Sequence, residues 1–306
     1  MPTSLTIVCA VDFSDHSKAA LRPALAWAGQ FSARLIVATV VEPLLASAAA
    51  AAYNMNLARD EVLPELREFV RKLGTERGSG VPPYEAVVLT GNPATEIVAL
   101  AQRERAGLLV IATHGLSGYR KMFLGSTTET VLRHTEVPVL VAPPPEQTPT
   151  RQAPPGQDPI LVPVDFKSGS VGAVRAAAGV ARVFRAPLLL AHVVAPLRGI
   201  DRFRAQLDTH NRVQIDRAEQ QMQQLVSEAG VKERIEKVVV SGSPAEEISE
   251  IAVARGAQLI VMRLRGEGGV LGSRPGSIAY HVLRLTPAMV LALPSDHTHA
   301  EWLERL

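Results

Sequence analysis

The stretch Leu108-Leu109-Val110-Ile111-Ala112-Thr113-His114-Gly115, followed after nine residues by Gly125-Ser126, decides the fold that we expect for this chain. Its first five residues form an apolar run that fits a buried strand. Glycines at 115, 118 and 125 predict a loop, and Thr127 to His134 have the pattern of a helix. A strand, a glycine-rich loop and a helix in this order are typical of doubly wound α/β domains.

The same segment is suited to binding a phosphate. A helix N-terminus leaves backbone N–H groups unpaired and carries about half a positive charge, so an anion is stabilised there without a lysine. Ser126, Thr127 and Thr128 add hydroxyl groups at this point. We therefore expect a nucleotide ligand, although a glycine after a strand and a serine at a helix start also occur for structural reasons alone.

The second half of the chain repeats the first. Three segments recur at nearly constant spacing: Val11-Asp12-Phe13 as Val164-Asp165-Phe166, Gly91-Asn92-Pro93-Ala94-Thr95-Glu96-Ile97 as Gly242-Ser243-Pro244-Ala245-Glu246-Glu247-Ile248, and Gly115 with Gly125-Ser126 as Gly266 with Gly276-Ser277. The chain is therefore a tandem repeat of one unit. The recurrence of the glycine motif in the second copy strengthens the nucleotide hypothesis.

The composition allows two ordinary domains with full hydrophobic cores. The 306 residues are 47% apolar and 20% charged, which excludes a chain that is disordered throughout. The 32 basic and 30 acidic side chains nearly cancel to a net charge of +2, so we expect neither a nucleic-acid partner nor a membrane-attracted face. The N-terminus resembles a first strand more than a signal peptide, and we expect a cytoplasmic protein.

Two segments have simple structural interpretations. Cys9, the single cysteine, lies in the apolar run Leu5–Val11, where we expect a buried small hydrophobic residue rather than a redox or nucleophilic group. The alanine-rich stretch Ala46–Ala52 is too short to span a membrane. We expect it to form a loop or helical turn that caps the sheet.

The segment over residues 143–159 predicts a domain linker. It holds seven prolines in 17 residues, a composition that cannot continue a helix or a central strand. We therefore predict a first domain over 1–142, a semi-rigid proline-rich linker over 143–159, a second domain over 160–294 and a C-terminal tail over 295–306.

Apolar runs alternate with helical patterns in both halves. The predicted strands of the first half are Leu5–Val11, Leu35–Val40, Ala86–Leu89, Leu108–Ala112 and Val137–Val141, and its predicted helices are Ser17–Gln30, Leu57–Leu73, Pro93–Arg103 and Thr127–His134. The predicted strands of the second half are Ile160–Val164, Leu188–Val194, Lys237–Val240, Gln258–Met262 and Met289–Leu293. Its longest helical pattern, Arg202–Ala229, mixes charges of both signs and indicates a solvated helix face.

These patterns predict the architecture of each domain. Strands that are apolar at nearly every position are buried on both faces, so we expect α/β domains, each a doubly wound five-stranded parallel sheet with helices on both faces. With a strand order of 3-2-1-4-5, Asp12 at the end of the first strand and Ala112 at the end of the fourth flank the crevice where the strand order reverses. Such sheets bind ligands in that crevice.

The motifs together resemble the universal stress protein family. The resemblance rests on Val11-Asp12-Phe13-Ser14, on Gly91–Ile97 and on Ala112–Gly115 with Gly125-Ser126, and it covers nearly the whole chain as two tandem copies. The ATP-binding branch of that family has glycine where this chain has Ala112, which adds only a methyl group. The resemblance thus implies an ATP-binding, stress-response protein, and a divalent cation such as Mg²⁺ would help to neutralise the triphosphate.

Carried over by position, the resemblance implies a role for nine residues of the first copy. Asp12 and the backbone at Val40 would contact adenosine. The ribose and α-phosphate would meet Ala112, His114 and Gly115, and the β- and γ-phosphates would meet Gly125, Ser126, Thr127 and Thr128. An alternative role for Asp12 is to cap the first loop or helix. An alternative for His114 is a loop position that faces solvent.

The second copy departs from this pattern. Arg263 stands where the first copy has Ala112, and Pro275 directly precedes Gly276. A guanidinium at that position either fills the ribose space or grips a phosphate from a shifted position. The corresponding contacts would be Asp165, Val193, Gly266, Gly276 and Ser277. We expect the second domain to bind ATP weakly or not at all.

The sequence leaves several classes of function open. In a regulatory protein, nucleotide occupancy would set conformation or association, with no catalytic residues. A slow ATPase is a second class, although the chain has neither a Gly-Lys-Ser/Thr phosphate loop nor a kinase His-Arg-Asp pattern. A third is a nucleotide-free interaction module. A metal enzyme ranks lower, because no His, Cys or carboxylate cluster has ligand spacing.

The partners expected from the sequence are an adenine nucleotide and another copy of the domain. The last predicted strands, Val137–Val141 and Met289–Leu293, are apolar edges that need cover. The resemblance implies that these two strands pair within the chain, and a homodimer of the whole chain is a further expectation. The sequence does not identify a downstream protein partner.

Overall fold

The protein divides into two compact units. The computed structural model describes residues 5–76, 80–114, 124–145, 158–167, 169–197, 204–264, 276–294, 301–304 and 306. The first unit holds the described residues up to 145, and the second holds those from 158 onward. The division falls in the predicted linker, most of which lies outside the described residues, so the domain boundaries stay predictions.

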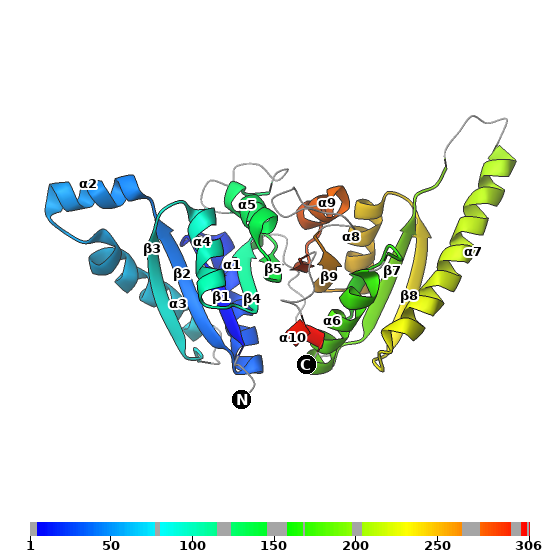
Figure 1. The fold of residues 1–306 in the computed structure, drawn as a ribbon, viewed down its shortest axis with the longest axis horizontal. Helices are drawn as coiled ribbons and strands as arrows, with labels where there is room; N and C mark the ends of the chain where they lie inside the picture. The colour runs from blue at the N-terminus through cyan, green and yellow to red at the C-terminus, as the bar shows by residue number, and fades with distance from the viewer. Residues whose placement is uncertain are drawn as a thin grey trace. The chain divides into compact units, whose positions relative to one another are not determined.

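The first unit is a five-stranded parallel sheet in the order β3-β2-β1-β4-β5, which confirms the predicted order (Figure 1). Its strands are β1 (Thr6–Ala10), β2 (Arg34–Val41), β3 (Tyr84–Thr90), β4 (Leu108–Ala112) and β5 (Val139–Ala142). Its helices are α1 (Asp15–Phe31), α2 (Pro43–Tyr53), the π-helical turn η1 (Ala58–Val62), α3 (Leu63–Glu76), α4 (Pro93–Arg103) and α5 (Ser126–His134).

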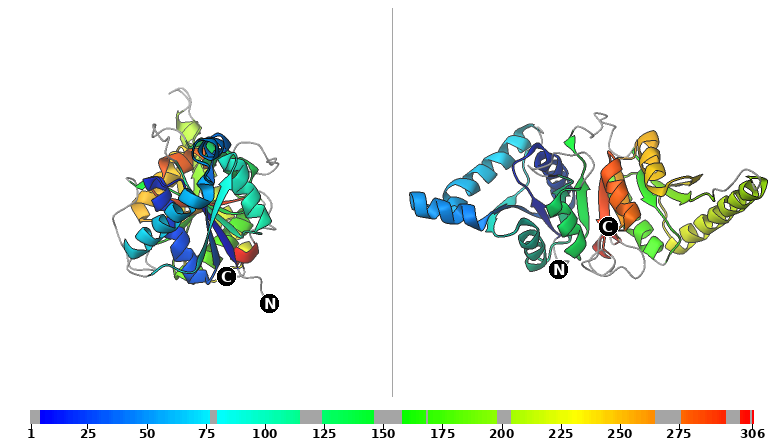
Figure 2. Two further views of the ribbon diagram at one scale, coloured as in Figure 1. Left: turned by 90° about the vertical axis from the view of Figure 1, so that its left-hand side faces the viewer. Right: turned by 90° about the horizontal axis from the view of Figure 1, so that it is seen from above.

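Helices cover both faces of this sheet, with α1 and α3 on one side and α4 and α5 on the other (Figure 2, right). The central strands β1 and β4 are therefore buried almost throughout. Cys9 on β1 is fully buried, as predicted, and burial raises the pKa of its thiol far above the ordinary value because the thiolate would lose its hydration.

The second unit repeats this topology in the order β8-β7-β6-β9-β10. Its strands are β6 (Ile160–Pro163), β7 (Leu188–Val194), β8 (Ile235–Ser241), β9 (Leu259–Arg263) and β10 (Met289–Leu293). Its helices are α6 (Gly169–Phe184), α7 (Arg204–Ala229), α8 (Pro244–Arg255), α9 (Ser277–Leu285) and α10 (Glu301–Glu304). Within the described part of the chain, no helix combines the length and the apolar character needed to cross a membrane.

The alanine-rich segment corrects one prediction. The expected loop or helical turn over the sheet is instead α2, a helix of 11 residues with none of them buried. Figure 1 shows α2 extending away from the edge of its sheet. Alanine has the highest helix propensity, Pro43 suits a first turn, and Asn54 ends the helix in the left-handed conformation at φ 49°. The local sequence therefore favours a helix here, although none of its residues is buried.

The predicted C-terminal tail ends in a packed element. Helix α10 lies against α6, and Leu303 is fully buried there. The two backbones approach so closely that a Cβ atom on Gly179 would lie 1.6 Å from the Leu303 carbonyl oxygen. The described end of the tail is therefore part of the second unit, and glycine is needed in α6 for this contact.

Candidate functional site

A cavity of about 310 Å³ lies at the carboxyl ends of β1, β2 and β4 in the first unit. Eight of the predicted site residues line it: Asp12, Val40, Ala112, His114, Gly125, Ser126, Thr127 and Thr128. The ninth, Gly115, lies outside the described residues. The structure thus brings together every predicted residue of the first copy that it describes, while their contact with a ligand stays a prediction.

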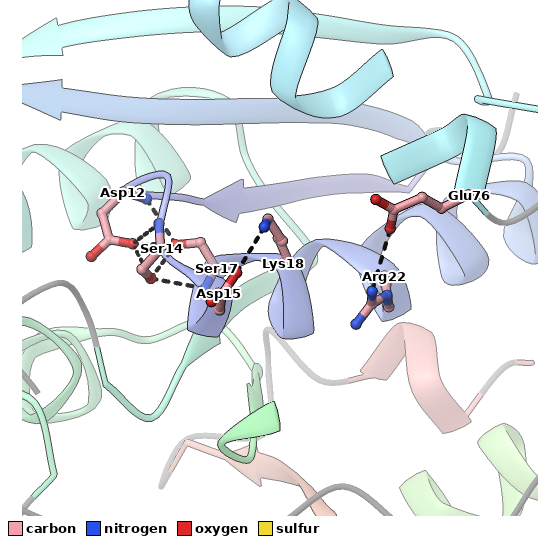
Figure 3. A network of polar contacts seen from close by, with 7 residues as sticks. All are labelled: Asp12, Ser14, Asp15, Ser17, Lys18, Arg22 and Glu76. Carbon is pink, nitrogen blue, oxygen red and sulfur yellow. Dashed lines mark hydrogen bonds and ion pairs between the residues drawn. The ribbon is translucent and has the colours of Figure 1, made fainter. Parts of the chain in front are cut away.

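The carboxylate of Asp12 is fixed by two serines at the start of α1 (Figure 3). Its Oδ1 accepts hydrogen bonds from Ser14 Oγ at 2.6 Å, Ser17 Oγ at 2.5 Å and the Ser14 N–H at 3.2 Å. In return, the Asp12 N–H donates to Ser17 Oγ at 2.8 Å. Ser14, rather than Asp12, is the N-cap of α1. Asp12 accepts the Ser14 N–H within the loop before α1 but does not cap the helix itself, and its second carboxylate oxygen points away from the serines in Figure 3.

Backbone hydrogen bonds fix the start of α5 next to the end of β4. The Gly125 N–H donates to the Thr113 carbonyl at 2.8 Å, and the Thr113 N–H donates to the Ala142 carbonyl at 3.0 Å. The Thr128 hydroxyl donates to the Ala112 carbonyl at 2.7 Å. These two N–H groups and the Thr128 hydroxyl therefore already donate hydrogen bonds within the fold. The first-turn N–H groups of α5 and the hydroxyls of Ser126 and Thr127 are better suited to donate to a phosphate.

The described lining of the first cavity is acidic. It contains the carboxylates of Asp12 and Glu42, and no lysine or arginine occurs among its described residues. Arg120 and Lys121 belong to the segment that the structure does not describe. No group of three or more His, Cys, Asp or Glu side chains within the described ranges can hold a metal ion. A polyanionic ligand here would therefore benefit from bringing its own cation.

Two further polar side chains neighbour residues of the lining without lining the cavity themselves. Thr113 is 3% exposed, and its hydroxyl oxygen has no hydrogen-bond partner within the described structure. The ring of His16, from the first turn of α1, lies 5.6 Å from the ring of His114. The sequence motifs did not single out His16, although it lies between Ser14 and Ser17 at the start of α1, close to Asp12 in the sequence.

The second unit has a corresponding cavity of about 280 Å³. Asp165, Val193, Gly276 and Ser277 line it as predicted, and Gly266 lies outside the described residues. The frame of the first site recurs, because the Gly276 N–H donates to the Leu264 carbonyl at 2.8 Å and Ser170 Oγ donates to Asp165 Oδ1 at 2.9 Å. Four residues of the second copy that the sequence named thus line one cavity, while their contact with a ligand stays a prediction.

The second cavity differs from the first in its side chains. Arg263, Lys167 and His192 line it together with Asp165. His192 donates from Nδ1 to the Val164 carbonyl at 2.7 Å, and its ring stacks on Phe166 with 4.3 Å between centroids. The sequence singled out Arg263 but missed Lys167 and His192. Aligning the two copies residue by residue would have shown both, since neither is matched by a similar side chain in the first copy.

Comparison with known proteins points to one family for both units. The model of the universal stress protein family matches residues 4–143 and 157–294. A universal stress protein of Thermus aquaticus is 36% identical over 138 residues, which cover 44% of this chain and 96% of that protein. One of Methanocaldococcus jannaschii is 32% identical over 145 residues, which cover 46% of this chain and 83% of that protein. The solved universal stress protein of Archaeoglobus fulgidus has a TM-score of 0.62 at 20% identity, covering 94% of this chain and 96% of that chain.

Proposed function

The chain belongs to the universal stress protein family, and we propose that its first unit binds ATP with Mg²⁺. In this proposal, occupancy of the site rather than turnover sets the conformation or association of the protein. The observation that carries the proposal is the cavity at the ends of β1, β2 and β4, where eight predicted residues from separate segments meet. That position is the one at which doubly wound sheets bind ligands.

The residues present fit such a ligand. Apolar side chains of the lining, such as Ile97 and Ile111, suit the faces of a base, and the serine-fixed Asp12 suits a hydroxyl or amino donor of adenosine. The first turn of α5 presents N–H groups to the phosphates. The hydroxyls of Ser126 and Thr127, which line the cavity at the start of α5, can donate to phosphate oxygens.

The acidic lining supports the choice of Mg²⁺ as companion ion. Asp12 and Glu42 repel a bare triphosphate, whereas Mg²⁺ usually binds through phosphates with only one or two carboxylates. The ion would supply charge neutralisation, and the residues of the chain would supply orientation. We therefore expect ATP affinity to fall when the divalent ion is removed.

Occupancy is favoured over turnover by the sequence. Rapid phosphoryl transfer needs charge neutralisation at the γ-phosphate and a group that orients water. The chain has no Gly-Lys-Ser/Thr loop for the first task. We expect any hydrolysis to remain below about one turnover per second, the lower end for working enzymes.

The start of α5 offers a sharp test. Ser126 is the first helical residue after the N-cap Gly125, whose ψ of 142° is compatible with a following proline. Ser126→Pro removes one N–H and the hydroxyl while keeping the helix, and Ser126→Ala removes the hydroxyl alone. We expect Ser126→Pro to weaken ATP·Mg²⁺ binding about 10- to 100-fold in calorimetry, as for a lost hydrogen bond to a charged group, and Ser126→Ala to weaken it less.

The second unit provides the matched control. Ser277 is the first helical residue after Gly276, so Ser277→Pro makes the same change in α9. It should leave ATP·Mg²⁺ binding to the first unit unchanged. If Ser126→Pro binds as tightly as the wild type, the phosphates do not lie at α5. If no nucleotide is recovered from denatured protein and ATP·Mg²⁺ does not raise the melting temperature, the interaction-module hypothesis is the better one. Pairing between the two halves and a homodimer stay predictions from the sequence.

A further inference from the structure

Two adjoining surface grooves of the second unit lie where the chain enters β7 and β8, at the opposite end of these strands from the cavity of that unit. Their volumes are about 520 and 540 Å³, and Arg182 and Glu233 line both. In Figure 1 they belong to the lower edge of the second unit, where α7 ends and β8 begins. We call them together the basic groove, because the described lining holds only two carboxylates, Glu233 and Glu304, but five cations: Arg175, Arg182, Arg185, Lys232 and Arg234.

Three of the five cations are not neutralised by the described part of the fold. Arg182 is paired with Glu233, with 3.0 Å between its Nε and the carboxylate, and the Arg175 guanidinium binds the last two carbonyls of α7 at 3.1 Å. The other three cations are exposed, and their side chains have no hydrogen-bond or ion-pair partner among the described residues: Arg185, Lys232 and Arg234. Three positive charges along the basic groove are therefore free to bind a partner.

The first unit has the corresponding groove without this charge. Ser32 stands there in the position of Arg185, and both residues are in the left-handed conformation, at φ 50° and 54°. The described lining of that groove contains one cation, Arg34, which is paired with Glu85 at 2.6 Å. Since a serine serves at this turn in the first unit, the backbone does not require an arginine in the second. The cations therefore belong to the surface chemistry of the second unit and not to the frame of the fold.

We propose that the basic groove binds a partner protein through an extended segment rich in aspartate and glutamate. A guanidinium can hold a carboxylate by two parallel hydrogen bonds, so arginines such as Arg185 and Arg234 suit acidic side chains. The cations come from two segments, the second half of α6 with its end and the turn before β8, and they line two adjoining grooves. This spread suits several carboxylates spaced along a peptide better than one small anion.

The same lining disfavours a nucleic acid as the occupant. Glu233 and Glu304 stand among the cations and repel a continuous phosphodiester chain, whereas a peptide can place carboxylates beside the arginines and uncharged residues beside the two glutamates. The described lining also contains no aromatic side chain on which a base could stack. The inference does not depend on nucleotide binding, because it concerns a different surface from the cavities at the carboxyl ends of the strands.

The test uses the full chain and a fluorescent peptide of about 12 residues in which glutamate alternates with glycine, roughly 40 Å long when extended. Fluorescence anisotropy measures its binding in about 50 mM salt and again in about 300 mM salt. We expect saturable binding at one site per chain that weakens at the higher salt concentration, because salt screens exposed charges. A peptide of the same length in which lysine alternates with glycine should not bind.

Two double variants separate the basic groove from the net charge of the chain. Arg185→Ser with Arg234→Gln removes two unpaired cations of the groove, and Ser32 shows that serine fits the left-handed position. It should weaken binding of the acidic peptide about tenfold, as for two exposed ion pairs of about threefold each. The matched control, Arg212→Gln with Arg217→Gln, removes two exposed charges of α7 that lie roughly 18 Å or more along the helix from its end. This control should leave the affinity unchanged within about twofold.

Three outcomes would overturn the proposal. The first is the absence of saturable binding of the acidic peptide at about 1 mM in low salt. The second is an equal loss in both double variants, because the peptide would then respond only to net charge. The third is tighter binding of a single-stranded DNA of similar length that the groove variant weakens, which would assign the groove to a nucleic acid. Arg234→Gln alone should still cause about a threefold loss, so the test stands even where the change at Arg185 disturbs the fold.

Discussion

Asp12 and Asp165 occupy the same position in the two units but are held with different tightness. Ser17 Oγ lies 2.8 Å from the Asp12 N–H and 2.5 Å from its carboxylate. The corresponding distances from Ser170 Oγ to Asp165 are 3.4 Å and 2.9 Å. Short, reciprocal bonds restrict the carboxylate most in the first unit, where a fixed orientation matters for the proposed nucleotide.

This difference predicts unequal effects of one substitution. Ser17 is 4% exposed, and its Oγ accepts the hydrogen bond of the Asp12 N–H. Ser17→Ala removes this buried acceptor and should lower the free energy of unfolding by about 1–3 kcal/mol. Ser170→Ala should cost less, because the bonds that it removes are longer. Urea unfolding reports each unit through its own tryptophan, Trp27 in the first and Trp302 in the second, with the other replaced by phenylalanine. Equal losses would mean that the distances do not reflect bond strength.

At the residue scale, the candidate site was predictable only in part. Glycine spacing and the repeat indicated Asp12, Ala112 and the start of α5, because these positions carry a pattern along the chain. The close approach of Arg263 to Gly169 was not predictable, since the two residues lie far apart in sequence and the contact appears only when β9 and α6 pack. Side-chain contacts between distant segments leave little trace in a single sequence.

At the scale of elements, the strands were predicted well and the helix α2 was not. Buried parallel strands such as β4 are continuous apolar runs, which separate them from amphipathic helices. The residues of α2 are apolar without periodicity, so the pattern gave no helical signal although alanine propensity favours a helix. The sequence therefore indicated the strands that pack in the sheet and missed one helix that buries none of its residues.

The contact between α6 and α10 predicts a glycine requirement. Gly179→Ala pushes a methyl group into the Leu303 carbonyl and should cost about 1–3 kcal/mol, as for overpacking, while exposing Trp302 on α10. Trp302 fluorescence should shift to longer wavelength. The control is Gly29→Ala in α1, where a Cβ meets nothing within 4 Å. This control should be neutral or stabilise by about 0.5–1 kcal/mol. An unchanged Trp302 spectrum in Gly179→Ala would show that α10 does not pack there in solution.

Arg34 links three elements of the first unit and predicts a dependence on pH. Its guanidinium donates to Glu85 on β3 at 2.6 Å and to Glu104 after α4 at 2.9 Å. The hydrogen bond from Arg34 lowers the pKa of Glu104 below its ordinary value of 4.5. A carboxylate with a lowered pKa in the folded state stabilises the protein above the unfolded pKa, and this contribution is lost as the pH falls through the folded pKa.

Glu104→Gln should therefore make the first unit less stable at neutral pH, by a small amount because the pair is exposed. The difference from the wild type should shrink below a pH of about 4, where Glu side chains become protonated. Urea unfolding followed by Trp27 at several pH values measures this. Glu61→Gln, an exposed change on η1, is the control. A difference that persists unchanged in acid would contradict the assigned role of the carboxylate.

At the scale of the whole molecule, two units of one topology carry cavities whose described linings differ in charged side chains, Asp12 and Glu42 in the first and Asp165, Lys167 and Arg263 in the second. The tandem organisation was predictable because the repeated motifs are written along the chain, whereas the strand order was assumed, since apolar runs locate strands without fixing their order in the sheet. The charge contrast depends on single side chains, Glu42 and Lys167 among them, that reach a crevice only after folding.

The contrast predicts that ATP·Mg²⁺ protects one half of the molecule. A ligand at about 100 times its dissociation constant stabilises the folded state that binds it by about 2.7 kcal/mol. The unfolding transition reported by Trp27 should therefore move to higher urea, while the transition reported by Trp302 should move less or not at all. Equal shifts of both transitions would show that the two units unfold together or that both bind the nucleotide.

The contact of Arg263 with Gly169 ties two distant positions of the second unit together. A side chain at position 169 would meet the Arg263 guanidinium, since even a Cβ atom there would lie 1.3 Å from Arg263 Nη1. The first unit has the small Ala112 at the strand end and the larger His16 at the helix start, so large and small residues are exchanged between the two positions. An arginine at position 112 beside an unchanged His16 would therefore overpack this space, at a cost of about 1–3 kcal/mol.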